Sequence, residues 1–450
     1  MGSFIVCLLA CGMIVLNMTW SWATGLILYF LSVNIHKYAS ISTQDAQGYQ
    51  FYNRFINGWW AIVGVGCFRF AIVNLIYQRY GFISLFWFAL LGLVITPYGM
   101  LIEDRYSAFT RWIFEQKKIY IESDIQKWRF SMAATLLNNA ANFALLVSLF
   151  KFIEGIWFYQ IFIVMSGAMF IFYYIYHARK KFKISDYNSL GKASPQKLTF
   201  KEIFDECKES FTRYGIYSTS ISEKVNDIMA YYINPFFIRC QIGANTVSIS
   251  SFLVQAIAAV VIISPVPWAW PVGLILYVIA TIGDHIAGRL ARATLKASFW
   301  GKFIEGWLDI LGLTCIRMAL TWVIYIKYSF CMLFWVALFS TLIIPYCMFM
   351  YDRYSSFARW INQELKVNIR PYLRNEKYVR PAHVIVDIER IMLLLSLFMF
   401  VPAMWGYFIV NSILYVGFIT YHLYSASLNF PVLKSSSQGE IFNRPLTSVI

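Results

Sequence analysis

Charged residues are scarce in this chain. They make up 14% of its 450 residues, whereas average soluble domains carry about 25%. Hydrophobic residues make up 59% and aromatic residues 19%, which is more apolar surface than a soluble core of this length needs. The composition therefore excludes an ordinary soluble domain and indicates an integral membrane protein.

Several other common features are missing. The eight cysteines include no Cys-x-x-Cys pair and several fall inside apolar runs, which favours small buried side chains over a disulfide framework or a zinc site. No polar leader with a cleavage site precedes the first apolar run, so we expect that run to be a span. The net charge of +15 needs no nucleic-acid partner, because Lys and Arg collect in cytosolic loops of membrane proteins. We expect no nucleic acid to bind.

Twelve apolar runs have roughly the length of a membrane span, for which about 20 residues are needed. They form two sets of six, separated by a polar stretch. The approximate runs are 3–17, 20–35, 57–77, 81–101, 130–150, 155–176, 247–264, 267–283, 306–326, 330–350, 388–404 and 407–428. The predicted fold class is an all-α polytopic membrane protein with about twelve transmembrane helices.

The two sets of runs are copies of one unit at a constant offset of 248 residues. Residues 104–106 (Asp-Arg-Tyr) match residues 352–354, and residues 58–59 (Gly-Trp) match residues 306–307. Chance matches among aromatic-rich spans would not keep one register over the whole unit. Six spans return the chain to its starting side, so we expect two parallel six-helix repeats packed as an internal pseudo-dimer.

The predicted domains follow from this duplication. They are a degenerate first repeat (1–178), a cytosolic linker (179–231) with a short helix near 200–211, a second repeat (232–430) and a cytosolic tail (431–450). Nearly all Lys and Arg lie in the linker, the tail and the loops on the same side, which predicts cytosolic N- and C-termini. Both an endoplasmic reticulum membrane and a bacterial inner membrane fit this pattern.

The repeats also act as a control on each other. The Asp-Arg-Tyr residues occur in both copies, so we interpret them as serving the fold, as a membrane-surface ion pair or helix end. Asp387 and Arg390 enter a span only in the second copy, where the first has Asn139 and Asn142. They are candidates for lining a cleft in the second copy.

One segment of the second copy has a distinctive spacing of small and acidic residues. Residues 284–309 read Asp-x2-Ala-Gly-x2-Ala-Arg-x8-Gly-x3-Glu-x3-Asp. On helices, Asp284 and Ala287 share one face, and Glu305 and Asp309 share a face of the next helix. We expect both faces to line one cytosol-facing cleft, where small residues let a ligand approach the backbone.

This spacing resembles the signature of the CDP-alcohol phosphotransferase family, Asp-x2-Asp-Gly-x2-Ala-Arg-x8-Gly-x3-Asp-x3-Asp. Six of its eight fixed positions match, namely Asp284, Gly288, Ala291, Arg292, Gly301 and Asp309. The approach through Asn234-Pro235 and residues 243–246 is also similar to the family's leading helix. The resemblance covers about 230–428 and extends in degraded form over 1–178.

The resemblance implies a phospholipid-biosynthetic transferase that displaces CMP from a CDP-linked substrate by an alcohol. Its partners would be a CDP-linked lipid or CDP-alcohol, an acceptor alcohol or diacylglycerol, and membrane lipid. By the same resemblance, Asp284, Glu305 and Asp309 would hold Mg²⁺ or Mn²⁺, and Asp309 would be the catalytic base. The positions implied to contact substrate are Gly288, Ala291, Arg292 and Gly301.

Two departures from the signature bear on activity. Glu305 replaces the third Asp and can still ligate a hard cation, whereas Ala287 replaces the second Asp and cannot. A two-ion site would therefore be weakened. The first copy has His36, Ala39, Asn57 and Ala61 at the four carboxylate positions. Two alternatives stay open: a pseudoenzyme of the same fold that binds lipid or supports assembly, and a transporter with two six-span repeats.

Overall fold

The structure, a computed structural model, describes residues 2–18, 20–42, 50–81, 83–121, 128–187, 221–294, 298–329, 331–370 and 387–430. Every regular element within these residues is a helix. Eight of the described helices are long and apolar enough to cross a membrane. The protein is therefore an all-helical, polytopic integral membrane protein, as the composition predicts.

The helices fall into two halves of the chain. The first half, residues 2–187, contains α1 (Gly2–Val15), α2 (Ser21–Ser42), α3 (Gln50–Tyr80), α4 (Ser84–Lys117), α5 (Trp128–Val147) and α6 (Phe152–Tyr187). The second half, residues 221–430, contains α8 (Ile221–Arg239), α9 (Ala244–Ile263), α10 (Ala269–Ala293), α11 (Phe299–Tyr328), α12 (Met332–Leu365), a short helix over 387–395 and α14 (Phe400–Asn429).

The candidate spans are α3, α4, α6, α9, α10, α11, α12 and α14. The apolar parts of α1 and α5 are shorter, at Gly2–Val15 and Leu136–Val147. Many large apolar side chains on the helices remain exposed, among them Ile27, Phe172 and Ile275, as expected of surfaces that face lipid. Any transmembrane helices beyond these eight remain a prediction from the sequence.

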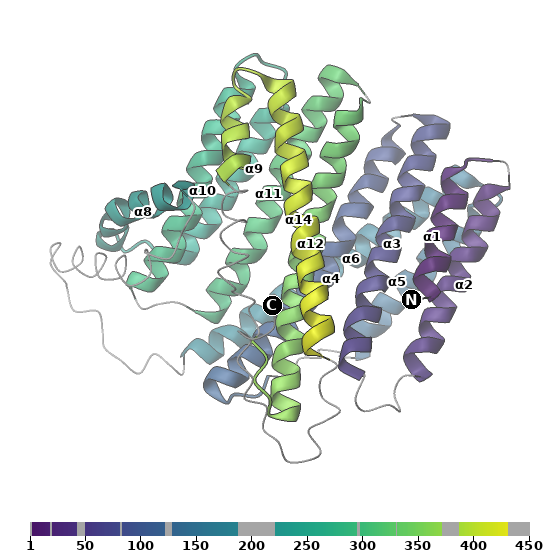
Figure 1. Ribbon diagram of the computed structural model, residues 1–450, viewed down its shortest axis with the longest axis horizontal. Helices are drawn as coiled ribbons and strands as arrows, with labels where there is room; N and C mark the ends of the chain where they lie inside the picture. Colours follow the sequence, from purple (N-terminus) through teal and green to yellow (C-terminus); the bar gives the residue numbers. More distant parts are fainter. Residues whose placement is uncertain are drawn as a thin grey trace.

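The two halves lie side by side and meet along α4 and α12 (Figure 1). In the view of Figure 1, the first half (purple to blue) is mostly on the right and the second half (teal to yellow) on the left. Helix α11 also packs against α4 and α6, and α3 packs against α12 and α14. The helices at this contact thus form one continuous bundle.

Some packing details recur at positions 248 residues apart. A Cβ on Gly25 would lie 2.4 Å from Cγ1 of Ile14, and a Cβ on Gly273 would lie 2.4 Å from Cγ1 of Ile262. Both distances are too short for any side chain, so glycine lets α2 approach α1 just as it lets α10 approach α9.

The Asp-Arg-Tyr residues join the two halves reciprocally. Nη1 of Arg105 lies 3.1 Å from Oδ2 of Asp352, and Nη1 of Arg353 lies 3.1 Å from Oδ2 of Asp104. Neighbouring residues on a helix point about 100° apart, so Asp104 and Arg105 cannot pair with each other. The structural role expected from the sequence takes the form of ion pairs that join the two halves, one buried and one half-buried, instead of a membrane-surface pair.

Aromatic rings from both halves fill the core around these ion pairs. The ring centroids of Phe55 and Phe357 are 5.5 Å apart, and those of Phe109 and Phe303 are also 5.5 Å apart. Both pairs meet edge to face, the arrangement that aromatic quadrupoles favour. The contact between the halves is thus a shared apolar core with two ion pairs inside it, of which one is buried and the other half-buried.

The helix bounds differ from the apolar runs in several places. Helices α4 and α12 continue well past the runs that end at 101 and 350, because their ends pack against each other through polar contacts that hydropathy ignores. The predicted span 388–404 is wrong as one element, since a turn at 396–398 separates two helices. Helix α6 extends to Tyr187 and α8 begins at Ile221, inside the predicted linker. The predicted linker helix and the tail lie outside the described residues.

Candidate functional site

Two of the predicted carboxylates meet where α10 and α11 lie next to each other. The carboxyl groups of Asp284 on α10 and Asp309 on α11 lie close enough to interact with each other. Glu305 lies one turn before Asp309 on α11 and interacts with its charge. All three side chains are half-buried. Two carboxyl groups this close repel each other unless they share a proton or a cation.

The start of α11 is fixed by a local cap. Oγ of Ser298 accepts a hydrogen bond of 2.8 Å from the backbone N–H of Gly301, as an N-cap serine does. A Cβ on Gly301 would lie 2.6 Å from Oδ1 of Asn245, at the beginning of α9. Close packing of α9 on α11 is therefore sufficient reason for glycine here, and its predicted contact with substrate stays a prediction.

The other signature positions lie on α10. Gly288 and Ala291 are half-buried, and the side chain of Arg292 lies outside the described part of the structure. Ala287 is only 1% exposed and packs in an apolar cluster with Ala230 of α8 and Val247 of α9. The missing carboxylate is thus replaced by apolar packing under α8 and not by another polar ligand.

The donor set suits one divalent cation better than two. Within the described ranges, no three His, Cys, Asp or Glu side chains are gathered closely enough to hold a metal ion by themselves. Mg²⁺, however, is commonly bound by one or two carboxylates together with phosphate oxygens of the substrate. Asp284 and Asp309 fit that arrangement, with Glu305 beside them.

The first half lacks this arrangement at the equivalent positions. His36 is half-buried on α2, and Asn57 and Ala61 are half-buried on α3. The side chain of Ala39 lies outside the described part. No carboxylate occupies any of these positions, so α2 and α3 cannot form the acidic pair that α10 and α11 form.

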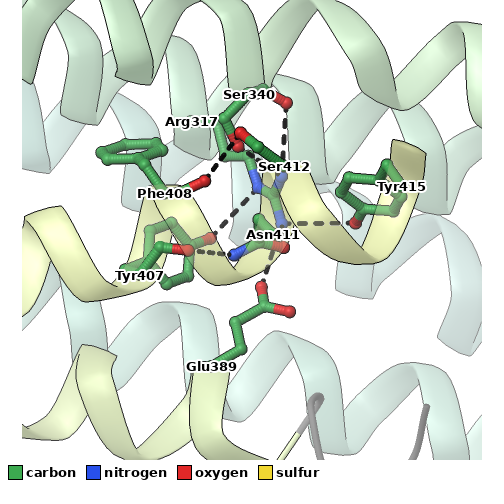
Figure 2. A network of polar contacts seen from close by, with 8 residues as sticks. All are labelled: Arg317, Ser340, Glu389, Tyr407, Phe408, Asn411, Ser412 and Tyr415. Atoms are coloured by element: carbon green, nitrogen blue, oxygen red, sulfur yellow. Dashed lines mark hydrogen bonds and ion pairs between the residues drawn. The ribbon is translucent and has the colours of Figure 1, made fainter. Parts of the chain in front are cut away.

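A second polar cluster, deeper along α11, was not predicted from the sequence. Figure 2 shows Arg317 surrounded by polar side chains from several helices. The guanidinium is fully buried and donates to Oε1 of Glu389 at 2.9 Å and to the hydroxyl of Tyr407 at 3.1 Å. It also donates to Asn411 Oδ1, Tyr415 Oη and Ser340. We call these six residues the Arg317 network.

The first half contains a reduced form of the Arg317 network. Nε of Arg69 donates to the hydroxyl of Tyr159 at 3.4 Å, and Nη1 donates to the carbonyl of Gly92 at 3.3 Å. These three positions match Arg317, Tyr407 and Ser340. The counterparts of Glu389, Asn411 and Tyr415 are Ala141, Ile163 and Gly167. The second half has therefore a buried ion pair where the first half has apolar residues.

The carboxylate that pairs with Arg317 is a neighbour of the residues predicted to line a cleft. Asp387 and Arg390 were the candidates, yet Glu389 is the one paired with Arg317. Nη1 of Arg390 is buried without a hydrogen-bond partner in the described part of the chain. The available signal was the lone carboxylate inside an apolar run, together with the Arg and Tyr that both halves keep.

Comparison with known proteins adds no family. The chain matches no protein-family model and no curated protein. The function therefore has to be inferred from the residues and their geometry.

Proposed function

We propose that the second half is a cation-dependent transferase site that displaces CMP from a CDP-linked substrate by an alcohol. The observation that carries the proposal is the contact between Asp284 on α10 and Asp309 on α11. The signature spacing predicts this convergence. Placing two acidic side chains inside apolar helices costs free energy, which favours a functional reason for their presence.

The residues have distinct roles in this proposal. Asp284 and Asp309 would supply oxygen ligands to Mg²⁺ or Mn²⁺, and substrate phosphate oxygens together with Glu305, one turn before Asp309, would complete the shell. The bound ion would neutralise charge on the diphosphate and on the departing CMP. Asp309 would also accept the proton of the alcohol hydroxyl. Arg292 would hold a phosphate, for which a planar guanidinium is well suited.

The proposal includes the architecture of two parallel six-helix repeats that pack as an internal pseudo-dimer with cytosolic termini. It is supported by the 248-residue register of the sequence and by the reciprocal ion pairs of Arg105 with Asp352 and of Arg353 with Asp104. A local two-fold relation of this kind is typical of parallel repeats related by an axis along the membrane normal.

The test is CMP release by the purified full-length protein with Mg²⁺ or Mn²⁺, using a panel of CDP-linked lipids and CDP-alcohols with acceptor alcohols and diacylglycerol. Asp309→Asn should lower the rate by about 10²–10⁴-fold, the usual contribution of a positioned base. Glu154→Gln removes an exposed carboxylate at the start of α6 and should leave the rate unchanged. Absence of CMP release with every donor, or an active Asp309→Asn variant, would refute the proposal.

A second candidate is a pseudoenzyme that binds the substrate without turning it over. It is favoured by Ala287, which packs against α8 where a catalytic member of the family would have a carboxylate. Cation-dependent binding of a CDP-linked lipid without CMP release would identify this function. The transporter is less well supported, because Arg317 inside the bundle is engaged by protein partners on all three of its nitrogens.

A further inference from the structure

Each half of the chain extends an arginine onto a helix of the other half. Nε of Arg105, on α4, donates to the carbonyl of Phe303 at 3.0 Å, and Nη2 donates to the carbonyl of Lys302 at 3.0 Å. Its remaining nitrogen, Nη1, is held by Asp352 of α12. Lys302 and Phe303 belong to the first turns of α11, three and two residues before Glu305.

The same contact occurs in the opposite direction. Nε of Arg353, on α12, donates to the carbonyl of Phe55 at 3.1 Å, and Nη2 donates to the carbonyl of Arg54 at 2.9 Å. Its Nη1 is held by Asp104 of α4. Arg353 therefore binds to backbone carbonyls of α3 in the first half as Arg105 binds to those of α11 in the second half.

A glycine makes room for each guanidinium. A Cβ on Gly306 would lie 2.3 Å from Nη2 of Arg105, and a Cβ on Gly58 would lie 2.0 Å from Nη2 of Arg353. Both distances are far below a normal contact, so any side chain at either position would displace the arginine. The two arginine contacts are thus equivalent, including the glycine that makes room for each.

The residues that follow the arginine contact on each helix differ between the halves. Glu305 and Asp309 follow on the helix held by Arg105, and Arg105 is near enough to Asp309 to interact with its charge. On the helix held by Arg353, the equivalent positions are Asn57 and Ala61. Only one of two matched contacts therefore fixes a helix that carries carboxylates.

We propose that Arg105 is a positioning residue through which the first half completes the carboxylate site of the second half. It holds the beginning of α11 through two carbonyls and thereby sets where Glu305 and Asp309 stand relative to Asp284. Its matched counterpart, Arg353, has only a structural role. The inference rests on the proposed function, because it assumes that Asp284 and Asp309 bind a cation.

The test compares two matched pairs of variants of the full-length protein, with Mn²⁺ alone as the probe and its affinity measured by electron paramagnetic resonance. Arg105→Gln and Gly306→Ala should weaken Mn²⁺ binding by about 10-fold or more, the usual effect of losing a residue that orients ligands. Arg353→Gln and Gly58→Ala should change it less than about twofold. Both pairs should lower the melting temperature, because both remove buried contacts.

The outcomes separate this inference from the proposed function. If Asp309→Asn binds Mn²⁺ as well as the unmodified protein does, the proposed function fails. If binding depends on Asp309 but Arg105→Gln and Arg353→Gln weaken it equally, the positioning role is overturned and the site remains. If Arg105→Gln does not fold, Arg105→Lys keeps the charge but not the forked geometry, and it should weaken Mn²⁺ binding more than Arg353→Lys does. Equal effects of the two lysine variants would again contradict the role.

Discussion

The two halves of the chain share their packing and differ in their polar interior. Gly25 and Gly273 permit the same close helix contact. The ion pairs of Arg105 and Arg353 are reciprocal, because each arginine pairs with an aspartate of the other half. The polar residues that line α10 and α11 have no such equivalents, since His36 and Ala61 stand at the positions of Asp284 and Asp309.

This difference distinguishes residues that maintain the fold from residues that are candidates for chemistry. A contact kept by both halves must serve packing in at least the first half, because the first half has no carboxylates at the signature positions. A polar group found only in the second half has to be explained in another way, since burying it is costly. The comparison also gives each residue of interest a matched control in the same molecule.

The largest expected difference between the halves concerns their buried arginines. Arg317→Met leaves the carboxylate of Glu389 buried without its partner, and breaking such a pair costs about 3–5 kcal/mol. Arg69→Met removes only the hydrogen bonds to Tyr159 and Gly92 and should cost about 1–2 kcal/mol. The free energy of unfolding in detergent measures both.

A double variant checks the reason for this difference. Arg317→Met combined with Glu389→Leu removes both charges and should recover most of the stability lost in Arg317→Met, because no charge is then left unpaired. If Arg69→Met is as damaging as Arg317→Met, or if the double variant is no better than the single one, the ion pair is not what distinguishes the halves here.

The next largest expected difference concerns how much each of the two reciprocal ion pairs contributes to stability. The side chains of Arg105 and Asp352 are 8% and 7% exposed, against 11% and 17% for Arg353 and Asp104. Asp352→Asn should therefore cost more, about 2–3 kcal/mol, than Asp104→Asn, about 1–2 kcal/mol. Thermal unfolding of the two variants compares them directly. A larger loss in Asp104→Asn would show that burial does not set the strength of these contacts.

Restoring the missing carboxylate should have opposite effects with and without a cation. Ala287→Asp places a charge in the apolar cluster under α8, so the variant should be less stable in the absence of metal, by about 1–3 kcal/mol. With Mn²⁺ present, an added ligand should increase the metal-dependent rise in melting temperature, because a cation that binds only the folded state stabilises it. Ala287→Asn controls for size. An unchanged or smaller Mn²⁺ response in Ala287→Asp than in Ala287→Asn would count against a cation at this site.

The smallest expected effect compares two matched tyrosines between the halves. The hydroxyl of Tyr98 donates to the carbonyl of Ile310 at 3.1 Å and also contacts Thr314. The buried hydroxyl of Tyr346 has no hydrogen-bond partner among the described residues. Tyr98→Phe should cost about 1 kcal/mol, whereas Tyr346→Phe should be close to neutral. Equal losses of stability would mean that the two hydroxyls are engaged alike.

The helical membrane fold could be predicted because apolar composition and run length report directly on lipid exposure. Helix ends could not, because α4 and α12 extend as polar, mutually packed helices. The turn at 396–398 was missed because only one polar residue, Ser396, interrupts the apolar residues around it. Pro402, in the first turn of α14, was a local sign that a new helix begins there.

The carboxylate site was predictable for a different reason from the Arg317 network. Asp284 and Asp309 lie on consecutive helices, so their spacing predicts that they meet. The partners of Arg317 come from α12, α14 and helix 387–395, up to 98 residues away, and no local spacing brings them together. The same holds for Arg105 and Asp352, which the sequence marks as shared between repeats without showing which residue pairs with which.

The most direct test of this account is the number of Mn²⁺ ions that the full-length protein binds, measured by electron paramagnetic resonance with and without a CDP-linked lipid. Because only the second half has carboxylates at the signature positions and Ala287 supplies none, we expect one Mn²⁺ per chain. That ion should be lost when Asp284 and Asp309 are both changed to Asn. No bound Mn²⁺ even with the CDP-linked lipid, or binding that survives the double substitution, would contradict the assignment of the site to the second half.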